Sequence, residues 1–223
     1  IMAFNNDNVA QTRDIMDFWR PNYSSTPYVN GMYSTQQYLD CLTTTWDEYK
    51  KRYDWTMDDF AAICFHLPYP KLALKGLRKM MDKTLSKEKQ DSLQENFDKS
   101  ILYSQMIGNI YTGSLFLGLL SLLENAETLK AGDKIALYSY GSGAVSEFFS
   151  GELVEGYEAY LDKERLSKLK QRTALSVADY EKVFFEDLQL DEYGSAQFAG
   201  YEYQDYALVE IVNHQRRYSK VEK

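Results

Sequence analysis

The stretch Ala61-Ala62-Ile63-Cys64-Phe65-His66-Leu67 is short and apolar, and Pro68 ends it. An apolar run of this length, with no polar residues at alternate positions before its end, is typical of a strand that is buried on both faces. Pro70 then fits the first turn of a helix, because a proline leaves no N–H unpaired there, and we expect that helix over residues 70–83. A buried strand followed by a helix indicates a sheet covered by helices.

The rest of the chain repeats this alternation of strand and helix. Helical spacing and longer apolar runs predict helices over residues 34–53, 87–107, 115–123, 157–171 and 176–188. Short apolar or β-branched runs predict strands over residues 1–4, 135–140, 145–154 and 206–212. We expect the first helix to begin at Ser34, which has capping-box spacing to Gln37. The chain contains no internal repeat and no linker, so the pattern predicts one α/β domain over residues 1–223.

Composition and charge argue against several classes of protein. The 223 residues are 44% hydrophobic and 26% charged, which is ordinary for a folded domain. The net charge of −8 argues against a nucleic-acid partner, because an acidic surface repels a phosphate backbone. The longest apolar stretch, residues 115–123, is about half of what a membrane span needs. Cys41 and Cys64 form neither a disulfide framework nor a zinc pair, so we expect no metal and a reducing, cytoplasmic setting.

His66 is the strongest candidate for chemistry, although a lone histidine is often structural. It ends the predicted buried strand, and ligands of α/β sheets gather beyond the carboxyl ends of strands. Cys64 would point to the same face, so a Cys64–His66 nucleophile pair is an alternative. A regular strand rarely brings such a pair within hydrogen-bond reach, and free cysteine is usually buried, so core packing is favoured. His214, late in the last strand, is interpreted as an exposed or satisfied histidine.

Three other features stand where they could bind a substrate. Asn109 lies between two helices, where its amide either donates to a carbonyl or caps the helix that follows. Ser142 lies in Tyr140-Gly141-Ser142-Gly143, which is either a plain hairpin turn or a turn whose N–H groups point at an oxyanion. Lys71 and Lys75 open a basic run on the helix after the buried strand, which is either a solvated face or a phosphate site.

Taken together, these motifs resemble one family. Cys64-Phe65-His66-Leu67-Pro68-Tyr69-Pro70-Lys71 is similar to the histidine motif of hydroxymethylglutaryl-CoA (HMG-CoA) synthases. Gly108-Asn109-Ile110-Tyr111-Thr112-Gly113-Ser114-Leu115 and Tyr140-Gly141-Ser142-Gly143 are similar to that family's next two motifs, in the same order. Asp17-Phe18-Trp19-Arg20-Pro21 and Tyr28-Val29-Asn30-Gly31 also resemble the family, its bacterial branch most closely. The resemblance implies the C-terminal half of a thiolase-like fold, with a mixed sheet layered between helices.

The resemblance also implies a reaction, the condensation of acetyl-CoA with acetoacetyl-CoA and water to give HMG-CoA and CoA in the mevalonate pathway. His66 would act as general acid on the developing alkoxide, Asn109 would orient the acetoacetyl thioester carbonyl, and the Ser142 N–H would help form an oxyanion hole. No cofactor beyond the CoA thioesters is implied. The residues expected to bind substrate or CoA are Lys71, Lys75, Gly141 and Tyr111.

The family's nucleophilic Cys and general-base Glu belong to its first half, and no segment of this chain resembles either motif. We therefore expect the N-terminal half of the same enzyme as a partner, a homodimer, and no complete reaction from this chain alone. Three alternatives stay open. One is a related enzyme that uses acyl-carrier-protein thioesters, and another is a non-catalytic dimerisation or binding module. The third is an autonomous Cys64–His66 hydrolase, which requires a low pKa of Cys64.

Overall fold

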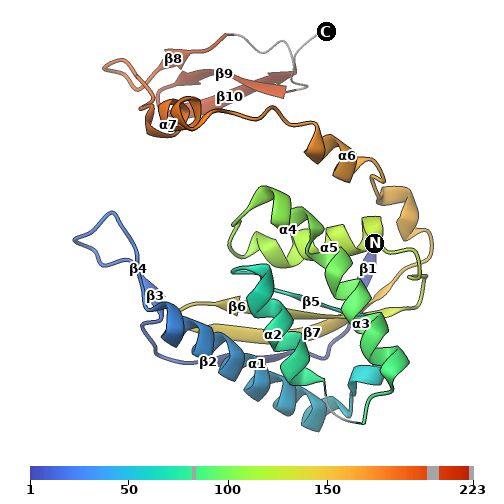
Figure 1. Ribbon diagram of the computed structural model, residues 1–223. Coiled ribbons are helices and arrows are strands. Elements are labelled where there is room, and N and C mark those ends of the chain that lie inside the picture. The colour runs from blue at the N-terminus through green and yellow to red at the C-terminus, as the bar shows by residue number, and fades with distance from the viewer. Residues whose placement is uncertain (82–83, 200–205, 221–223) are drawn as a thin grey trace. The chain divides into compact units, whose positions relative to one another are not determined.

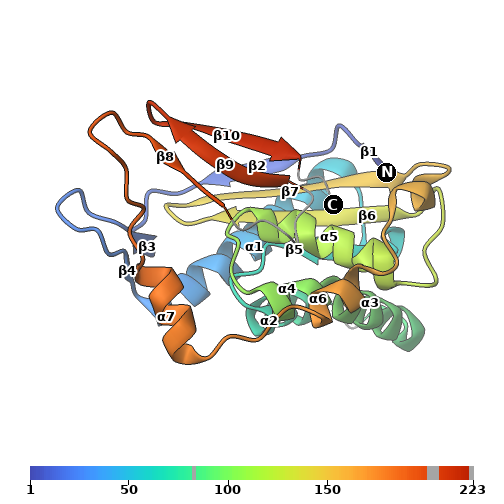
Figure 2. The same cartoon turned by 90° about the horizontal axis from the view of Figure 1, so that it is seen from above.

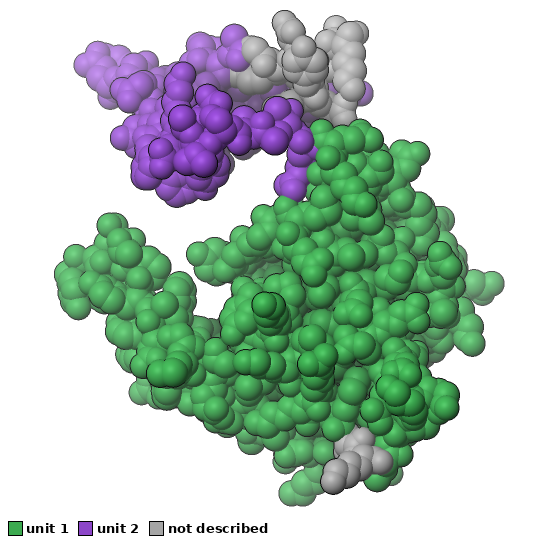
Figure 3. Space-filling view, viewed as in Figure 1, with its two compact units in different colours: residues 1–171 green, residues 172–223 purple. Residues whose placement is uncertain are grey.

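The computed structural model describes residues 1–81, 84–199 and 206–220. The chain divides into two compact units, residues 1–171 and residues 172–223, which Figure 3 colours separately. Where the sequence predicts one domain, the structure has two units. Their boundary follows Gln171 in an exposed polar segment without the prolines and glycines that mark a linker. None of the helices in these described ranges combines the length and apolarity that crossing a bilayer requires.

The first unit is built on a mixed sheet (Figure 1). β5 is parallel to β6, and β7 is antiparallel to β6 and pairs along its other edge with β1 and β2. The described strands of this sheet are β1 Met2–Phe4, β2 Val9–Thr12, β5 Ala62–Phe65, β6 Lys134–Gly141 and β7 Val145–Leu153. The strands predicted over 1–4, 61–67, 135–140 and 145–154 are confirmed. A separate hairpin joins β3 Phe18–Trp19 to β4 Tyr28–Val29.

Helices enclose this sheet in two hydrophobic cores. The helices of the unit are α1 Gly31–Tyr53, α2 Pro70–Met80, α3 Lys87–Ser100, α4 Leu102–Ile107, α5 Gly113–Asn125 and α6 Arg165–Lys170, with 3-10 turns η1 Met57–Asp59 and η2 Tyr157–Tyr160. Ile63 and Phe65 of β5 enter the core formed with α1 and α2. Ala62 and Cys64 enter the core formed with α5, which Figure 2 shows alongside β6. The strand is therefore buried on both faces, as its composition predicts.

The first long helix begins at Gly31 and not at Ser34. Its N-cap is Asn30, whose side-chain oxygen accepts a hydrogen bond from the N–H of Tyr33 at 3.2 Å. The Ser34 hydroxyl donates instead to the carboxylate of Asp17 at 3.3 Å. Asparagine and serine are equally good N-caps, so the helical pattern alone does not distinguish the two starts.

The helix predicted over residues 87–107 is interrupted at Ile101, which separates α3 from α4. Ser121 of α5 stabilises the interruption. Its hydroxyl donates to the carbonyl of Lys99 at 2.6 Å and accepts from the N–H of Tyr103 at 3.4 Å. The Ser121 side chain thus bonds main-chain groups next to the interruption. Because Ser121 lies on another helix, no local sequence pattern could predict the interruption.

The helix predicted over residues 157–171 is wrong, because only η2 and the short α6 form there. Glu124 of α5 is the physical reason. Its carboxylate accepts from the backbone N–H of Asp162 at 2.8 Å and from the guanidinium of Arg165 at 2.9 Å. These bonds hold the segment between η2 and α6 against α5 in a non-helical conformation.

The second unit, in its described part, consists of a helix and a small antiparallel sheet. Its elements are α7 Val177–Phe185, β8 Ala196–Gln197, β9 Tyr206–Val212 and β10 Gln215–Lys220. The helix predicted over 176–188 and the strand predicted over 206–212 are confirmed. β10 was missed because its residues are polar and exposed. His214 is exposed, as expected, but it lies in the turn between β9 and β10 and not late in the last strand.

Candidate active site

The position of His66 is fixed by its backbone at the carboxyl end of β5. Its N–H donates to the carbonyl of Tyr138 on β6 at 2.7 Å, which continues the parallel pairing one residue past the strand. Its carbonyl accepts from the phenol of Tyr38 on α1 at 2.9 Å. Both main-chain groups are therefore satisfied within the protein, and the imidazole is left to face the space beyond the strand.

The imidazole of His66 contacts the start of α5. Its Nδ1 lies 3.1 Å from the hydroxyl oxygen of Ser114, and that hydroxyl also accepts from the N–H of Leu67 at 2.9 Å. Burial disfavours the charged ring and lowers the pKa of His66 to about 4. The ring is thus neutral near pH 7, with Nε2 as the nitrogen that Ser114 does not contact.

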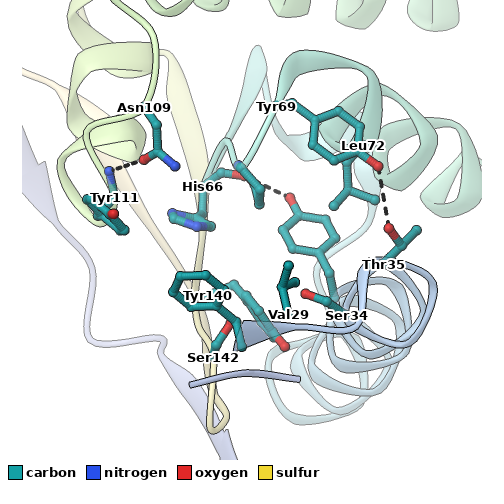
Figure 4. Close-up of a pocket in the computed structure, with 14 residues that line it drawn as sticks. Val29, Ser34, Thr35, His66, Tyr69, Leu72, Asn109, Tyr111, Tyr140 and Ser142 are labelled. Atoms are coloured by element: carbon teal, nitrogen blue, oxygen red, sulfur yellow. Dashed lines mark hydrogen bonds between the residues drawn. The ribbon is translucent and has the colours of Figure 1, made fainter. Parts of the chain in front are cut away.

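A cavity of about 250 Å³ opens beside this ring (Figure 4). It brings together residues from the hairpin, α1, the end of β5, α2, the α4–α5 connection and the end of β6. These residues are Phe18, Val29, Gly31, Ser34, Thr35, Tyr38, His66, Pro68, Tyr69, Leu72, Asn109, Tyr111, Tyr140 and Ser142. Four predicted site residues, His66, Asn109, Tyr111 and Ser142, therefore share one cavity although they lie far apart in the sequence.

Asn109 is oriented by its own turn. Its Oδ1 accepts a hydrogen bond from the N–H of Tyr111 at 2.7 Å, as drawn in Figure 4. Tyr111 has a positive φ of 51° and Gly108 one of 85°, which gives the connection its sharp bend. Because the carbonyl end of the amide is engaged, the Nδ2 group is the end that can donate to a ligand.

The turn that contains Ser142 is held by a buried carboxylate. Asp17 is 0% exposed, and its Oδ1 accepts from the N–H of Gly143 at 3.1 Å. Its Oδ2 accepts from the phenol of Tyr140 at 2.8 Å, and burial together with this carboxylate raises the pKa of Tyr140. The turn is thus fixed from behind, and Ser142 lies on its cavity side (Figure 4).

The remaining predicted binding residues lie outside the cavity wall. Lys71 and Lys75 are exposed on α2, one helical turn apart, and neither forms an ion pair with another described residue. Lys79, further along α2, pairs with Asp40 at 3.8 Å. Gly141 is half-buried at the end of β6, where it pairs with β7.

Cys64 is a core residue and not a nucleophile. It is 0% exposed in the core around α5, and burial raises the pKa of its thiol to about 12. The partner of the His66 ring is Ser114 and not Cys64. The hypothesis of a Cys64–His66 hydrolase is therefore wrong, because it requires an accessible thiol of low pKa.

Three residues of this site were missed from the sequence. Asp17 and Ser114 both stand inside motifs that resemble the family, so the motif itself was a signal that was not used. For Tyr38, the sequence pattern predicted only a position on the apolar face of a helix. Its hydrogen bond to His66 joins residues 28 positions apart, which local spacing does not reveal.

A family model described as hydroxymethylglutaryl-coenzyme A synthase C terminal matches residues 8–99 and 77–206. The chain belongs to the HMG-CoA synthase family. The hydroxymethylglutaryl-CoA synthase of Enterococcus faecalis is 49% identical over 193 residues, which cover 86% of this chain and 50% of that protein. The chain thus spans about half the length of the curated relatives it matches.

Two further matches are a curated protein and a solved structure. The polyketide biosynthesis 3-hydroxy-3-methylglutaryl-ACP synthase PksG of Bacillus subtilis is 31% identical over 178 residues, 77% of this chain and 42% of that protein. A crystal structure of an HMG-CoA synthase complexed with CoA is 64% identical, with a TM-score of 0.90 over 99% of this chain and 57% of that chain. This match confirms the α/β fold with a mixed sheet that the HMG-CoA synthase motifs implied.

The low pKa of His66 gives a pH prediction for the folded chain. A free imidazole titrates near pH 6.5, so between about pH 6.5 and 4 the unfolded chain binds a proton that folded His66 does not. The stability that this difference contributes is complete above about pH 6.5 and is lost as the pH falls towards 4. We expect no titration of the His66 ring between about pH 8 and 5 in NMR spectra. A midpoint near 6.5 would contradict a desolvated ring.

Proposed function

We propose that this chain forms the C-terminal part of an HMG-CoA synthase. The reaction is the condensation of acetyl-CoA with acetoacetyl-CoA and water to give 3-hydroxy-3-methylglutaryl-CoA and CoA. The observation that carries the proposal is the convergence of His66, Asn109 and Ser142 on one cavity, in a chain that belongs to the family. No segment of this chain resembles the motifs of the nucleophilic Cys and general-base Glu, and we propose that another segment supplies both.

Each of the three residues has a role that its geometry supports. The neutral ring of His66 presents its Nε2–H, which donates a hydrogen bond to the ketone oxygen of acetoacetyl-CoA and stabilises the alkoxide as the new bond forms. Asn109 presents its Nδ2 to the thioester carbonyl. The N–H of Ser142, in a turn fixed by Asp17, donates to the oxyanion of the acyl intermediate.

The test is a condensation assay with free acetyl-CoA and acetoacetyl-CoA. Because the chain lacks the Cys and Glu motifs, it is assayed together with a polypeptide that carries them. We expect HMG-CoA to form and its formation to depend on His66. Binding of acetoacetyl-CoA by the chain alone, followed by calorimetry, gives an independent measurement. If neither product nor binding is found, the chain is a non-catalytic module of this fold.

Lys71 and Lys75 are proposed to bind the phosphates of coenzyme A. They are exposed cations one turn apart on the helix that borders the cavity, in a protein of net charge −8. Changing both to Ala is expected to weaken CoA binding about tenfold at low salt, and less at high salt, because phosphate contacts of exposed charges are screened. Calorimetry measures the affinity. The matched control is K51A, which removes an exposed lysine of α1, and equal affinities of the two variants would contradict the assignment.

The 31% sequence identity to PksG supports a second candidate function, that of an enzyme that acts on acyl-carrier-protein thioesters. The two candidates differ in how the substrate is presented. A free CoA needs a local phosphate site such as Lys71 and Lys75, whereas a carrier protein needs a broad docking face. Parallel assays with acetoacetyl-CoA and with the same acyl group on a carrier protein separate them, and we expect the free CoA thioester to be preferred.

The cellular setting follows from the same proposal. We propose that the enzyme works in the cytoplasm as a homodimer and serves the mevalonate pathway. Its support is the family resemblance and the two buried, unpaired cysteines, which suit a reducing compartment. Sedimentation of the enzyme is expected to give twice the mass of one subunit.

A further inference from the structure

Ser114 is a buried polar residue whose side chain serves the ring of His66. It lies in the first turn of α5 and is 1% exposed. Its hydroxyl oxygen is 3.1 Å from His66 Nδ1 and accepts from the N–H of Leu67 at 2.9 Å. The two contacts join the residues that follow β5, His66 and Leu67, to the first turn of α5.

Counting hydrogen bonds at this hydroxyl selects one form of the ring. A serine hydroxyl has one proton to donate and two lone pairs. One lone pair already accepts from Leu67. If Nδ1 carried the proton, the oxygen would accept twice and its own proton would need another acceptor, and none is found among the described residues. If Nδ1 is unprotonated, the hydroxyl donates to it, and the Ser114 hydroxyl, the Leu67 N–H and Nδ1 all have partners.

We propose that Ser114 is a positioning residue that donates to His66 Nδ1 and thereby keeps the ring proton on Nε2, facing the cavity. This proposal rests on the proposed role of His66 as the hydrogen-bond donor to the substrate oxygen. A neutral imidazole can donate to the substrate only if the nitrogen that faces the substrate carries the proton. Ser114 supplies this condition before substrate binds, in the way that a third group orients the base of a catalytic triad. The motif 108–115 therefore serves the reaction twice, through Asn109 and through Ser114.

The first test is the tautomer of His66 in the wild-type chain, read from long-range 15N–1H NMR correlations of the imidazole. The chain has only two histidines, so a H214Q variant assigns the spectrum. We expect a single tautomer, in which Nε2 carries the proton and Nδ1 carries none. A ring with its proton on Nδ1 would overturn the proposal directly, whatever the variants do.

The second test compares S114A with S114T in the same spectra and in the condensation assay. S114A is expected to give a mixture of tautomers and to lower kcat about 10- to 100-fold with little change in KM, while S114T restores both. S104A is the matched control, because Ser104 is also buried on a helix but its hydroxyl has no hydrogen-bond partner among the residues that the structure describes. Unchanged tautomer and kcat in a folded S114A would overturn the proposal.

The two proposals fail in different ways. If the tautomer is as expected but His66 is not needed for product formation, the role of His66 is wrong and the contact with Ser114 is only structural. If His66 is needed but the tautomer does not depend on Ser114, the function stands and the positioning role falls.

Discussion

Replacing His66 by Ala is expected to lower kcat of the condensation by a factor of about 10² to 10³, which is the range for removal of a hydrogen-bond donor to a developing oxyanion. The fold should survive the change, because the main-chain hydrogen bonds of His66, to Tyr138 and from Tyr38, do not involve the ring. The ring's contact with Ser114 is lost, but the Ser114 hydroxyl still accepts from the N–H of Leu67. KM for acetoacetyl-CoA should change much less than kcat, since the negative charge on the ketone oxygen develops only as the new bond forms. Steady-state kinetics measure both constants.

The matched control for this prediction is H214Q. His214 is the other histidine of the chain and is exposed in the second unit, so its replacement should leave kcat unchanged. Thermal unfolding of both variants checks that each is folded. A folded His66→Ala variant with wild-type kcat would remove His66 from the reaction and, with it, the chemical part of the proposed function.

Local patterns were sufficient for the elements that position this histidine. The apolar run 61–67 predicts a strand with two buried faces, and Pro70 marks the start of α2 at the residue where the structure has it. Both signals lie within a few residues of the feature that they predict. The predicted start of α1 was wrong because Asn30 and Ser34 are both good N-cap residues. In the structure Asn30 caps the helix, and the Ser34 hydroxyl donates to Asp17, which is distant in the sequence.

The site itself was predictable only through the family motifs. Spacing alone left Asn109 as a possible helix cap and Ser142 as a plain turn residue, and nothing local relates either to His66. The contacts that complete the site span long distances in the chain, with 48 positions between Ser114 and His66 and 126 between Asp17 and Gly143. Such pairs are created by packing α5 and the segment that precedes β3 against the sheet, and this packing leaves no periodic signal in the sequence.

The segment 157–171, for which the predicted helix was wrong, contains Arg165, which forms an ion pair with the buried Glu124. Removing this ion pair is expected to have a large effect on stability. Glu124 has a side chain that is 0% exposed, and Arg165 pairs with it at 2.9 Å. Arg165→Ala would leave the carboxylate buried without its cation. We expect the free energy of unfolding to fall by about 2–3 kcal/mol, less than the 3–5 kcal/mol of a fully buried pair, because the arginine side is 38% exposed and water can partly replace it.

Urea unfolding of the wild type and of R165A measures this loss, and its pH dependence identifies the cause. Burial alone would raise the pKa of Glu124, but hydrogen bonds from Arg165, Tyr103 and the Asp162 N–H outweigh it and hold the pKa below its ordinary value. The stability from this carboxylate is therefore present above the unfolded pKa, near 4.3, and is lost as the pH falls through the lower folded pKa. The difference in the free energy of unfolding between wild type and R165A should shrink over the same pH interval.

The control is K168A, which breaks an exposed ion pair in the same segment and should leave the unfolding curve nearly unchanged at every pH. If R165A lost no more stability than K168A, the ion pair would not be what holds the segment on α5.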